Sequence, residues 1–384
     1  MTTANETMNE LGKLNEYYKT LFPFAQLFRW LSYGDDGDLF SRRDVAYQIA
    51  TAASDHFVRY KSWHDFESFA TEIRRVNPKR IDIGAIYSCA PAQRCALGSQ
   101  FLPQLKELVF DIDISDYNDV RFCCTETNIC ARCWPLIAIA VQLIDRRLRE
   151  EFVFNDILWV YSGRRGVHCW VSDRAALLLG NGARASVLSF LSLPLTDENG
   201  QFVVRLPEIQ NPSVFVRYQQ LCAPFLRYAE IQELFLRPER WNALLARVVK
   251  SEKTRNELCA LLSDGTVVST NERWLQMCAI IEQNELTERI LQEIVFTVVH
   301  PRFDVRVTID TKHLLKCPFV VHPETKRVCI PFAVDTVDQF NPLAVPTTAQ
   351  LLDDGIVGAA ARAALAAAVT LFERFVDVSL NERN

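Results

Sequence analysis

Residues 107–114 read Glu-Leu-Val-Phe-Asp-Ile-Asp-Ile, an alternation that constrains the fold more than any other segment. Because successive side chains of a strand point to opposite faces, the even-numbered apolar residues share one face, and Val109, Asp111 and Asp113 share the other. The two aspartate Cα atoms then lie about 6.5–7 Å apart. Like charges this close repel in a half-buried strand unless a cation neutralises them, which argues against a solvated edge strand. The segment predicts a strand that holds divalent ions in the geometry of two-metal phosphoryl transfer.

A third carboxylate comes from residues 302–309, Arg-Phe-Asp-Val-Arg-Val-Thr-Ile, which also alternate. The pattern predicts a second strand, with Asp304 on its polar face between Arg302 and Arg306. An aspartate between two arginines is also typical of a salt-bridged strand residue. Asp304 becomes a candidate metal ligand only if its segment lies beside the first strand.

A basic turn joins two apolar segments, residues 157–162 and 167–171, through Gly163-Arg164-Arg165-Gly166. Apolar strands around a glycine-bounded turn predict a β-hairpin. Glycines let backbone N–H groups approach an anion, and arginine forks match phosphate oxygens. A solvated basic turn would not explain the Ser162 and His168 side chains on either side of the arginines, so we expect a triphosphate-binding loop.

Positive charge is also concentrated in residues 301–330, which carry six Lys and Arg against three acids, a local balance of +3. The whole chain has 42 Lys and Arg against 47 Asp and Glu, a net charge of −5, so the other 354 residues sum to −8. This balance argues against a protein that coats nucleic acid through bulk positive charge. Within the basic segment, His313, Lys316 and His322 are candidates to contact phosphate or ribose groups.

Four of the twelve cysteines, Cys123, Cys124, Cys130 and Cys133, fall within eleven residues. Four thiolates, two of them in a C-x-x-C turn, satisfy tetrahedral zinc, and clustering makes four unlinked thiols a poorer interpretation. We expect a structural zinc site that braces the chain leaving the carboxylate strand. The other eight cysteines fit small core residues in a reducing compartment.

The chain has 384 residues, more than the roughly 250–300 at which a single core stops growing, so we expect two lobes. The pattern predicts a mainly helical segment to about Ile73, then strands at 80–87, 107–114, 157–161 and 167–171. Helices dominate from 194 to 299, with long ones at 231–249 and 274–298; strands resume at 302–309 and 327–332, and a short helix covers the alanine-rich run 358–369. The expected fold class is mixed α/β (α+β): β-sheets flanked by helices in a lobe of residues 1–193 and 300–384, with the zinc motif at 123–133 and an inserted helical lobe at 194–299.

We expect no membrane association and no export. The N-terminal residues are polar, and the longest apolar stretch, 135–144, has about ten residues where a membrane span needs roughly 20.

Together these motifs resemble the catalytic small subunit of archaeal and eukaryotic DNA primases, most closely the eukaryotic form found with DNA polymerase α. The resemblance spans about residues 15–330 in the same order. It rests on Phe110–Tyr117, the Cys-Cys-x5-Cys-x2-Cys cluster, Ser162–His168 and the segment after Asp304, with weaker matches at Arg59-Tyr60 and Ile81–Tyr87.

The resemblance implies a primase-type catalytic lobe in which Asp111, Asp113 and Asp304 hold catalytic Mg²⁺ or Mn²⁺. The family's Arg-Glu-aromatic stretch is matched by Arg43-Asp44-Val45, so Asp44 is a further catalytic candidate with a shorter side chain. The implied nucleotide-binding residues come from the hairpin, from the segment after Asp304 and from the N-terminal half: Ser162, Gly163, Arg164, Arg165, Gly166, Val167, His168, His313, Leu314, Leu315, Lys316, His322, Arg59, Arg80 and Asp82.

The implied activity is synthesis of RNA primers on single-stranded DNA from ribonucleoside triphosphates, in the nucleus. The implied partners are a primase large subunit and the DNA polymerase α complex. Two alternatives are a stand-alone primase-polymerase in repair and a non-catalytic, zinc-containing structural subunit.

Overall fold

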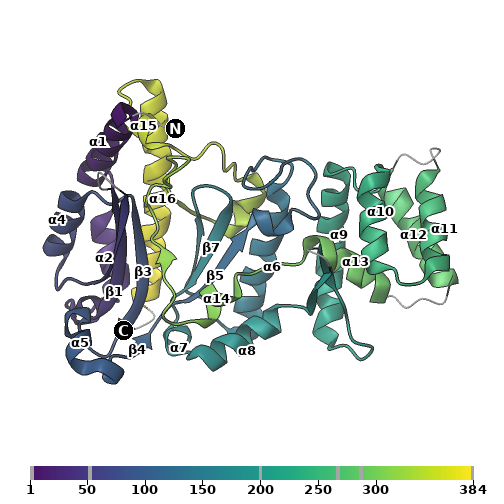
Figure 1. Ribbon diagram of the computed structural model, residues 1–384, viewed down its shortest axis with the longest axis horizontal. Coiled ribbons are helices and arrows are strands. Elements are labelled where there is room, and N and C mark those ends of the chain that lie inside the picture. Colours follow the sequence, from purple (N-terminus) through teal and green to yellow (C-terminus); the bar gives the residue numbers. More distant parts are fainter. Residues whose placement is uncertain (1–3, 51–53, 199–200, 265–268, 285–288, 382–384) are drawn as a thin grey trace. The chain divides into compact units, whose positions relative to one another are not determined.

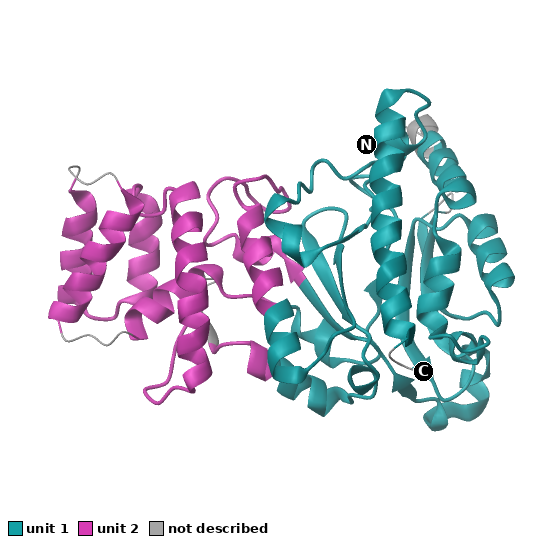
Figure 2. Cartoon of the chain, turned by 180° about the vertical axis from the view of Figure 1, so that it is seen from behind, with its two compact units in different colours: residues 1–111, 145–188, 303–384 teal, residues 112–144, 189–302 magenta. Residues whose placement is uncertain are grey.

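The computed structural model describes residues 4–50, 54–198, 201–264, 269–284 and 289–381. Its internal contacts divide the chain into two units (Figures 1 and 2). Unit 1 contains residues 1–111, 145–188 and 303–384, and unit 2 contains residues 112–144 and 189–302. Residues 112–144, which include the four clustered cysteines, therefore group with the helical unit, whereas we predicted them in the α/β lobe.

The first sheet of unit 1 is antiparallel, with the order β10-β3-β1-β2 and β4 paired to β3. Its strands are β1 (Arg43–Ala50), β2 (Asp55–Lys61), β3 (Arg80–Tyr87), β4 (Pro103–Leu105) and β10 (Leu315–Lys316). The strand predicted at 80–87 is confirmed, but the mainly helical prediction to Ile73 is wrong for β1 and β2. In β1, Val45 and Tyr47 alternate with Asp44 and Ala46, a period of two that satisfies a sheet and not a helix.

The second sheet of unit 1 has the order β11-β6-β7-β5. Its strands are β5 (Leu108–Asp113), β6 (Ile157–Tyr161), β7 (Gly166–Val171) and β11 (Pro331–Phe332), and the last two residues of β5 are counted in unit 2. The predicted carboxylate strand and the predicted hairpin are both confirmed. β6 and β7 pair in unbroken register from Ile157↔Val171 to Tyr161↔Val167. The prediction at 327–332 holds only for β11 and for isolated bridges at Arg327 and Val328.

The segment after Phe303 corrects a prediction, because residues 302–309 do not form a strand. Asp304 is the N-cap of the short helix α14 (Val305–Ile309) and accepts hydrogen bonds from the backbone N–H groups of Arg306 (3.0 Å) and Val307 (3.3 Å). An aspartate that caps a helix satisfies its first free N–H groups, which here outweighs the β preference of the valines.

Helices of unit 1 cover the sheets. The buried ring of Trp30 contacts Trp170 of β7 and Phe372, with ring centroids 5.3 and 5.6 Å apart, and its Nε1 donates to Ser172 Oγ at 3.0 Å. The helices are α1 (Ala4–Thr20), α2 (Phe24–Ser32), α3 (Asp38–Ser41), α4 (Phe66–Val76), α5 (Arg94–Leu97), α7 (Arg174–Leu177), α15 (Thr348–Leu351) and α16 (Ile356–Asn381), with 3-10 turns at Pro91–Gln93, Gly98–Gln100 and Val334–Gln339.

Helix α16 is much longer than the short helix predicted at 358–369. Its buried residues Leu365, Phe372 and Val376 continue at helical spacing beyond the alanine run, which explains the extra length. By length and composition alone α16 could cross a membrane, and 28% of its most apolar window is buried. It packs against α2, β6 and β11 (Figure 1), so part of its apolar surface belongs to the core of unit 1.

Unit 2 is mainly helical, as predicted, with a small hairpin of β8 (Leu195–Glu198) and β9 (Gln201–Val204). The single helix predicted at 231–249 is wrong, because α9 ends at Ile231 and α10 begins at Pro238, a residue suited to the first helical turn. The span 274–298 divides between α12 and α13, and residues 285–288 lie outside the described chain. The helices are α9 (Pro212–Ile231), α10 (Pro238–Val248), α11 (Glu252–Ser263), α12 (Thr270–Gln283) and α13 (Arg289–Val299), with a 3-10 turn at Ile114–Tyr117; α6 (Trp134–Phe152) and α8 (Asn181–Leu191) have residues in both units.

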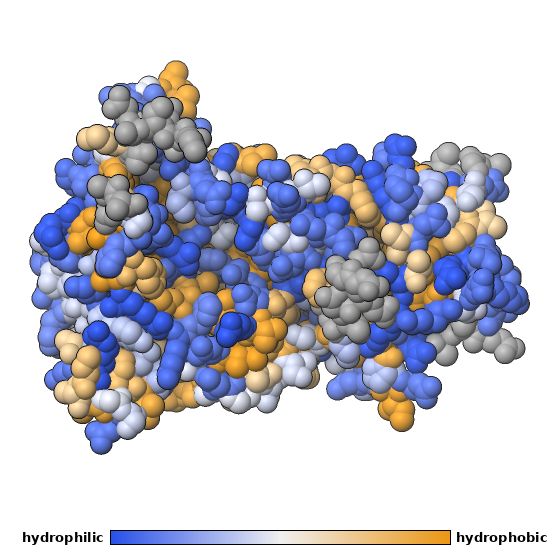
Figure 3. All heavy atoms as spheres, in the orientation of Figure 1, coloured by the Kyte–Doolittle hydropathy of each residue, from blue (hydrophilic) through white to orange (hydrophobic). Residues whose placement is uncertain are grey.

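The surface is mostly hydrophilic on the face shown in Figure 3, with apolar residues scattered among charged ones. Such scattered residues are ordinary for a folded chain and mark no interaction surface by themselves.

Candidate active site

One face of the first sheet brings together residues that lie far apart in the sequence. Residues directly opposite in neighbouring strands point to the same face. Asp82 pairs with Ala46 and with Lys316, and Gln48 pairs with Arg80 and with Phe57. This face therefore carries the predicted residues Arg80, Asp82 and Lys316 together, from the two strands β3 and β10.

Asp82 is almost completely buried on this face and is ion-paired to Arg80, with Arg80 Nε 2.7 Å from Asp82 Oδ1. Burial raises the pKa of Asp82, and the nearby charges of Arg80, Lys316 and His313 only partly oppose the effect. A buried carboxylate edged by cations can accept hydrogen bonds from a polar ligand.

Asp44 lies on the same strand face, fully buried. Its Oδ2 accepts from Arg59 Nε at 2.8 Å and its Oδ1 from the Tyr60 backbone N–H at 2.9 Å. Burial lowers the pKa of Arg59, but the carboxylate of Asp44 more than compensates, so that pKa is raised. The structure thus shows Asp44 holding Arg59 in place, and its catalytic role stays a prediction.

A cavity of about 450 Å³ opens over this face. That volume is in the range of small-molecule sites. It brings together five of the predicted nucleotide-binding residues and adds four residues that were not predicted. The lining residues are Gln48, Phe57, Arg59, Arg80, Asp82, Asp310, Lys312, His313 and Leu314.

The β6–β7 turn forms a tight loop held from both sides. Ser162 N–H donates to Gly166 O at 2.9 Å, and Gly166 N–H donates to Ser162 Oγ at 3.2 Å. Gly163 has φ +87°, and a Cβ there would lie 2.8 Å from His322 Cβ, so only glycine fits. Lys316 Nζ donates to Ser162 O at 3.0 Å, which links the turn to the first sheet.

The pKa of His322 reflects burial and the positive charge around this turn. Its pKa falls to about 3 because burial disfavours the charged ring and because Lys316, Arg164, Arg165 and Arg80 lie nearby. One of these charges, Arg164, is ion-paired to Glu324 at 2.5 Å. Four cations near one neutral imidazole give this region the charge that a polyanion would complement.

The carboxylates lie beside this basic region. Asp111 Oδ1 is 3.8 Å from Nε2 of His168 on β7, and burial together with Lys316 and Arg80 lowers the pKa of His168 well below its usual value. The Asp304 N–H donates to Asp111 O at 3.2 Å. Asp304 therefore does lie beside the carboxylate strand, although its segment is a helix start and not a strand.

These carboxylates suit hard cations. Asp111 and Asp113 lie two residues apart on β5, and carboxylate oxygens are the ligands that Mg²⁺ and Mn²⁺ prefer. Asp113 Oδ1 accepts from the N–H and Oγ of Ser115, at 2.8 and 2.7 Å, which fixes its orientation. His168 Nδ1 is buried and has no hydrogen-bond partner in the described chain.

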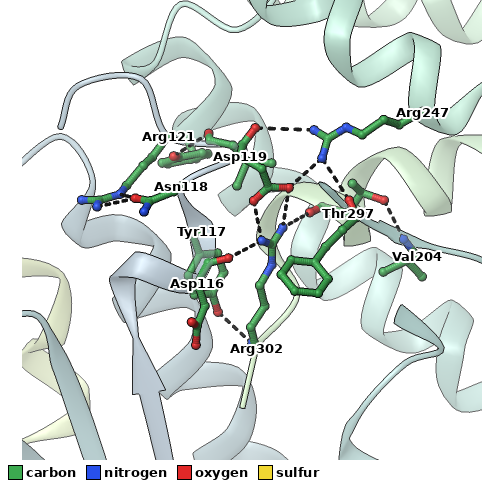
Figure 4. A network of polar contacts seen from close by, with 12 residues as sticks. Asp116, Tyr117, Asn118, Asp119, Arg121, Val204, Arg247, Thr297 and Arg302 are labelled. Atoms are coloured by element: carbon green, nitrogen blue, oxygen red, sulfur yellow. Dashed lines mark hydrogen bonds and ion pairs between the residues drawn. The ribbon is translucent and has the colours of Figure 1, made fainter. Parts of the chain in front are cut away.

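A buried network of ion pairs and hydrogen bonds in unit 2, which was not predicted, holds the segment after Asp113 and the segment before Asp304 (Figure 4). Asp119 Oδ1 lies 2.5 Å from Arg302 Nη1, and Asp119 Oδ2 lies 2.6 Å from Arg247 Nη1. The Arg302 N–H donates to the Tyr117 hydroxyl at 2.9 Å. Tyr117 follows Asp113 by four residues and Arg302 precedes Asp304 by two, so the network restrains both segments.

The four predicted cysteines do converge. The Sγ atoms of Cys123, Cys124, Cys130 and Cys133 all lie within 4.8 Å of one another, so the cluster could hold a metal ion such as zinc. Gln232, fully buried at the end of α9, donates from Nε2 to Cys123 Sγ (3.4 Å) and to Arg132 O (2.7 Å), and its Oε1 accepts from the Phe122 N–H (2.9 Å).

The chain is similar in sequence to known proteins. The family model of the DNA primase small subunit matches residues 110–334. The chain is 36% identical over 352 residues to the DNA primase small subunit of Schizosaccharomyces pombe, covering 88% of this chain and 76% of that protein. It is 34% identical over 354 residues to that of Drosophila melanogaster, covering 88% and 80%. The archaeal DNA primase small subunit PriS of Methanothermobacter thermautotrophicus is 28% identical over 249 residues, covering 63% and 70%.

Proposed function

Since the chain belongs to the family of eukaryotic DNA primase small subunits and has the role of the primase catalytic subunit in replication, we propose that it joins ribonucleoside triphosphates on single-stranded DNA by two-metal nucleotidyl transfer. One observation carries the proposal: Asp111 lies 3.8 Å from His168 of the basic hairpin. A carboxylate next to a polyanion site is the arrangement that metal-assisted phosphoryl transfer requires.

In this proposal Asp111, Asp113 and Asp304 hold Mg²⁺ or Mn²⁺, which when bound activates the attacking hydroxyl and neutralises the leaving pyrophosphate. Arg164 and Arg165 bind the triphosphate through their forks, and Ser162 and Gly166 offer the polar atoms of the turn. His168 stays neutral and contributes a hydrogen bond instead of a charge. Asp82, the strand partner of Lys316, accepts a hydrogen bond from a ribose hydroxyl in this proposal.

The catalysis assigned here needs no protein nucleophile. Positioning of the triphosphate and neutralisation of its charge supply the rate enhancement, as in other phosphoryl-transfer enzymes. Zinc at the four cysteines would brace the chain after β5, as the four soft donors and their separations suit that ion.

We further propose that the chain works in the nucleus, in a heterodimer with a primase large subunit and within the DNA polymerase α complex. Its charge supports a dependence on a partner: the net charge is −5, whereas residues 301–330 sum to +3 and the hairpin adds Arg164 and Arg165. Because phosphate contacts dominate nucleic-acid affinity, the isolated chain should hold DNA weakly and depend on a partner.

The test is primer synthesis on single-stranded DNA with Mg²⁺ or Mn²⁺ and ribonucleotides. Asp111→Asn should abolish product while its thermal unfolding midpoint stays within a few degrees of the unmodified chain. The exposed Asp36→Asn is the matched control and should leave synthesis intact. Undiminished synthesis by Asp111→Asn would overturn the proposal, and the non-catalytic alternative predicts no synthesis by any variant.

A further inference from the structure

Phe57 on β2 is a large apolar side chain that the core does not use. It is 51% exposed and makes no ring pair with any described aromatic residue. Its strand neighbour on the same face, two residues on, is Arg59, and both side chains line the 450 Å³ cavity. An exposed aromatic ring among charged groups in a cavity is placed for a ligand more than for stability.

The sheet register sets where Phe57 lies relative to the triphosphate region. From β10 across β3 and β1 to β2, the pairs Lys316↔Asp82 and Gln48↔Phe57 mark three strand spacings. Phe57 belongs to the row of Gln48 and Arg80, two residues along the strands from the row of Asp82 and Lys316. At about 4.8 Å a strand spacing and about 3.3 Å a residue, Phe57 is roughly 16 Å from Lys316. A nucleoside triphosphate whose phosphates lie at Lys316 and whose ribose lies at Asp82 would extend its base toward Phe57.

We propose that Phe57 is a stacking platform for the nucleobase of the bound ribonucleoside triphosphate, an inference that rests on the proposed function. Every base has a π face, so an aromatic platform binds all four without selecting among them. That tolerance suits a chain that must copy any template. Gln48, directly opposite Phe57 on β1, would border the same base and offers a polar edge.

The platform should contribute measurably to nucleotide affinity. Stacking of one base on an aromatic side chain corresponds to roughly a 5- to 100-fold change in the dissociation constant on removal of the ring. The loss should appear for purine and pyrimidine triphosphates alike. It should also appear in KM with kcat little changed, because Phe57 contacts no reacting atom.

The experiment titrates the full chain with 2-aminopurine ribonucleoside triphosphate and a divalent ion, without template, and follows quenching of the base fluorescence. The unmodified chain and Phe57→Tyr should bind and quench. Phe57→Leu should bind roughly 5- to 100-fold more weakly and quench less at saturation. Val153→Ala, which also removes exposed apolar surface in unit 1, is the matched control and should behave like the unmodified chain.

The outcomes separate the platform from the function on which it rests. If Phe57→Leu binds and quenches like the unmodified chain, the platform is overturned and the proposed function stands. If the unmodified chain fails to bind the triphosphate, the proposed function is overturned and the platform falls with it. Equal losses in Phe57→Leu and Val153→Ala would also overturn the platform, since they would reflect general loss of apolar surface.

Discussion

Replacing Gln232 by alanine should weaken the metal site of the four cysteines without touching a ligand. The amide of Gln232 ties Phe122-Cys123 to Arg132, the residue before Cys133, and so joins the two halves of the cluster through three hydrogen bonds. Its donation to Cys123 Sγ also stabilises negative charge on sulfur. Residues that orient metal ligands from behind typically account for about 10- to 100-fold in metal affinity, or about 1.4–2.8 kcal/mol.

The structure also fixes a stability cost for Gln232→Ala. The Phe122 N–H and the Arg132 carbonyl would each lose a partner at a position where Gln232 itself has no exposed surface. An unsatisfied buried polar group costs about 1–3 kcal/mol, so with two such groups the zinc-loaded chain should lose about 2–6 kcal/mol of unfolding free energy. Gln232→Glu separates the two effects, because it keeps the acceptor for Phe122 and places a carboxylate against the thiolates. It should retain more stability than alanine at saturating zinc and yet bind zinc at least as weakly.

The assay is transfer of zinc to a chromogenic chelator, with urea unfolding measured at saturating zinc and with the chelator in excess. Gln283→Ala, at the exposed end of α12, is the matched control. Zinc release from Gln232→Ala at the unmodified rate and affinity would refute the reasoning, whatever its stability.

Three further predictions follow from buried or clustered charges. Arg165→Ala should raise the KM for nucleotide roughly 10- to 100-fold, since a charge-assisted hydrogen bond contributes about 1.5–3 kcal/mol, with an unchanged melting temperature; an unchanged KM would count against the hairpin as the phosphate site. Asp119→Asn leaves Arg302 and Arg247 buried without their shared carboxylate, so it should lower the free energy of urea unfolding by about 3–5 kcal/mol. The exposed Asp116→Asn is the control and should change it little. Equal effects of the two variants would contradict a stabilising role of the network. Glu107 is fully buried, and although burial raises its pKa, Arg43, Lys106 and Tyr33 lower it to about 2 from a usual 4.5. Since the folded chain binds this proton less readily, its stabilising effect is complete above pH 4.5 and is lost as the pH falls toward 2; Glu107→Gln should flatten that part of the unfolding free-energy profile, and an unaltered slope would contradict the assignment.

Local patterns predicted those parts of the site that depend on a few neighbouring residues. The period of two in residues 107–114 predicted the strand β5. The glycine-bounded turn at 163–166 predicted the hairpin of β6 and β7. The close spacing of the cysteines likewise predicted their convergence. In each case the residues that meet are near one another in sequence, so spacing alone determines their geometry.

The failures occurred where two local preferences compete. The alternation at 302–309 favours a strand, but Asp304 can cap a helix, and the capping hydrogen bonds to Arg306 and Val307 prevailed. In the N-terminal region, helical spacing among the leucines obscured the shorter period of β1. No sequence pattern indicates that Asp119 pairs with residues 128 and 183 positions away. None indicates that Cys123 contacts Gln232, 109 positions away. Such pairs follow from the packing of distant elements and carry no signal in spacing.

The distribution of charge shows how an acidic chain can serve a reaction of polyanions. A uniformly basic surface would bind nucleic acid along its whole length, and the −8 outside residues 301–330 opposes that. The candidate site, by contrast, has local positive charge. Burial and four nearby cations lower the pKa of His322 to about 3, so its ring is neutral near pH 7. The same cations suit the negative charge of a triphosphate, and Asp111, 3.8 Å from His168, offers a carboxylate to divalent ions beside them. On the proposed function, this distribution of charge favours binding of the nucleotide with its metal ions over binding of the template.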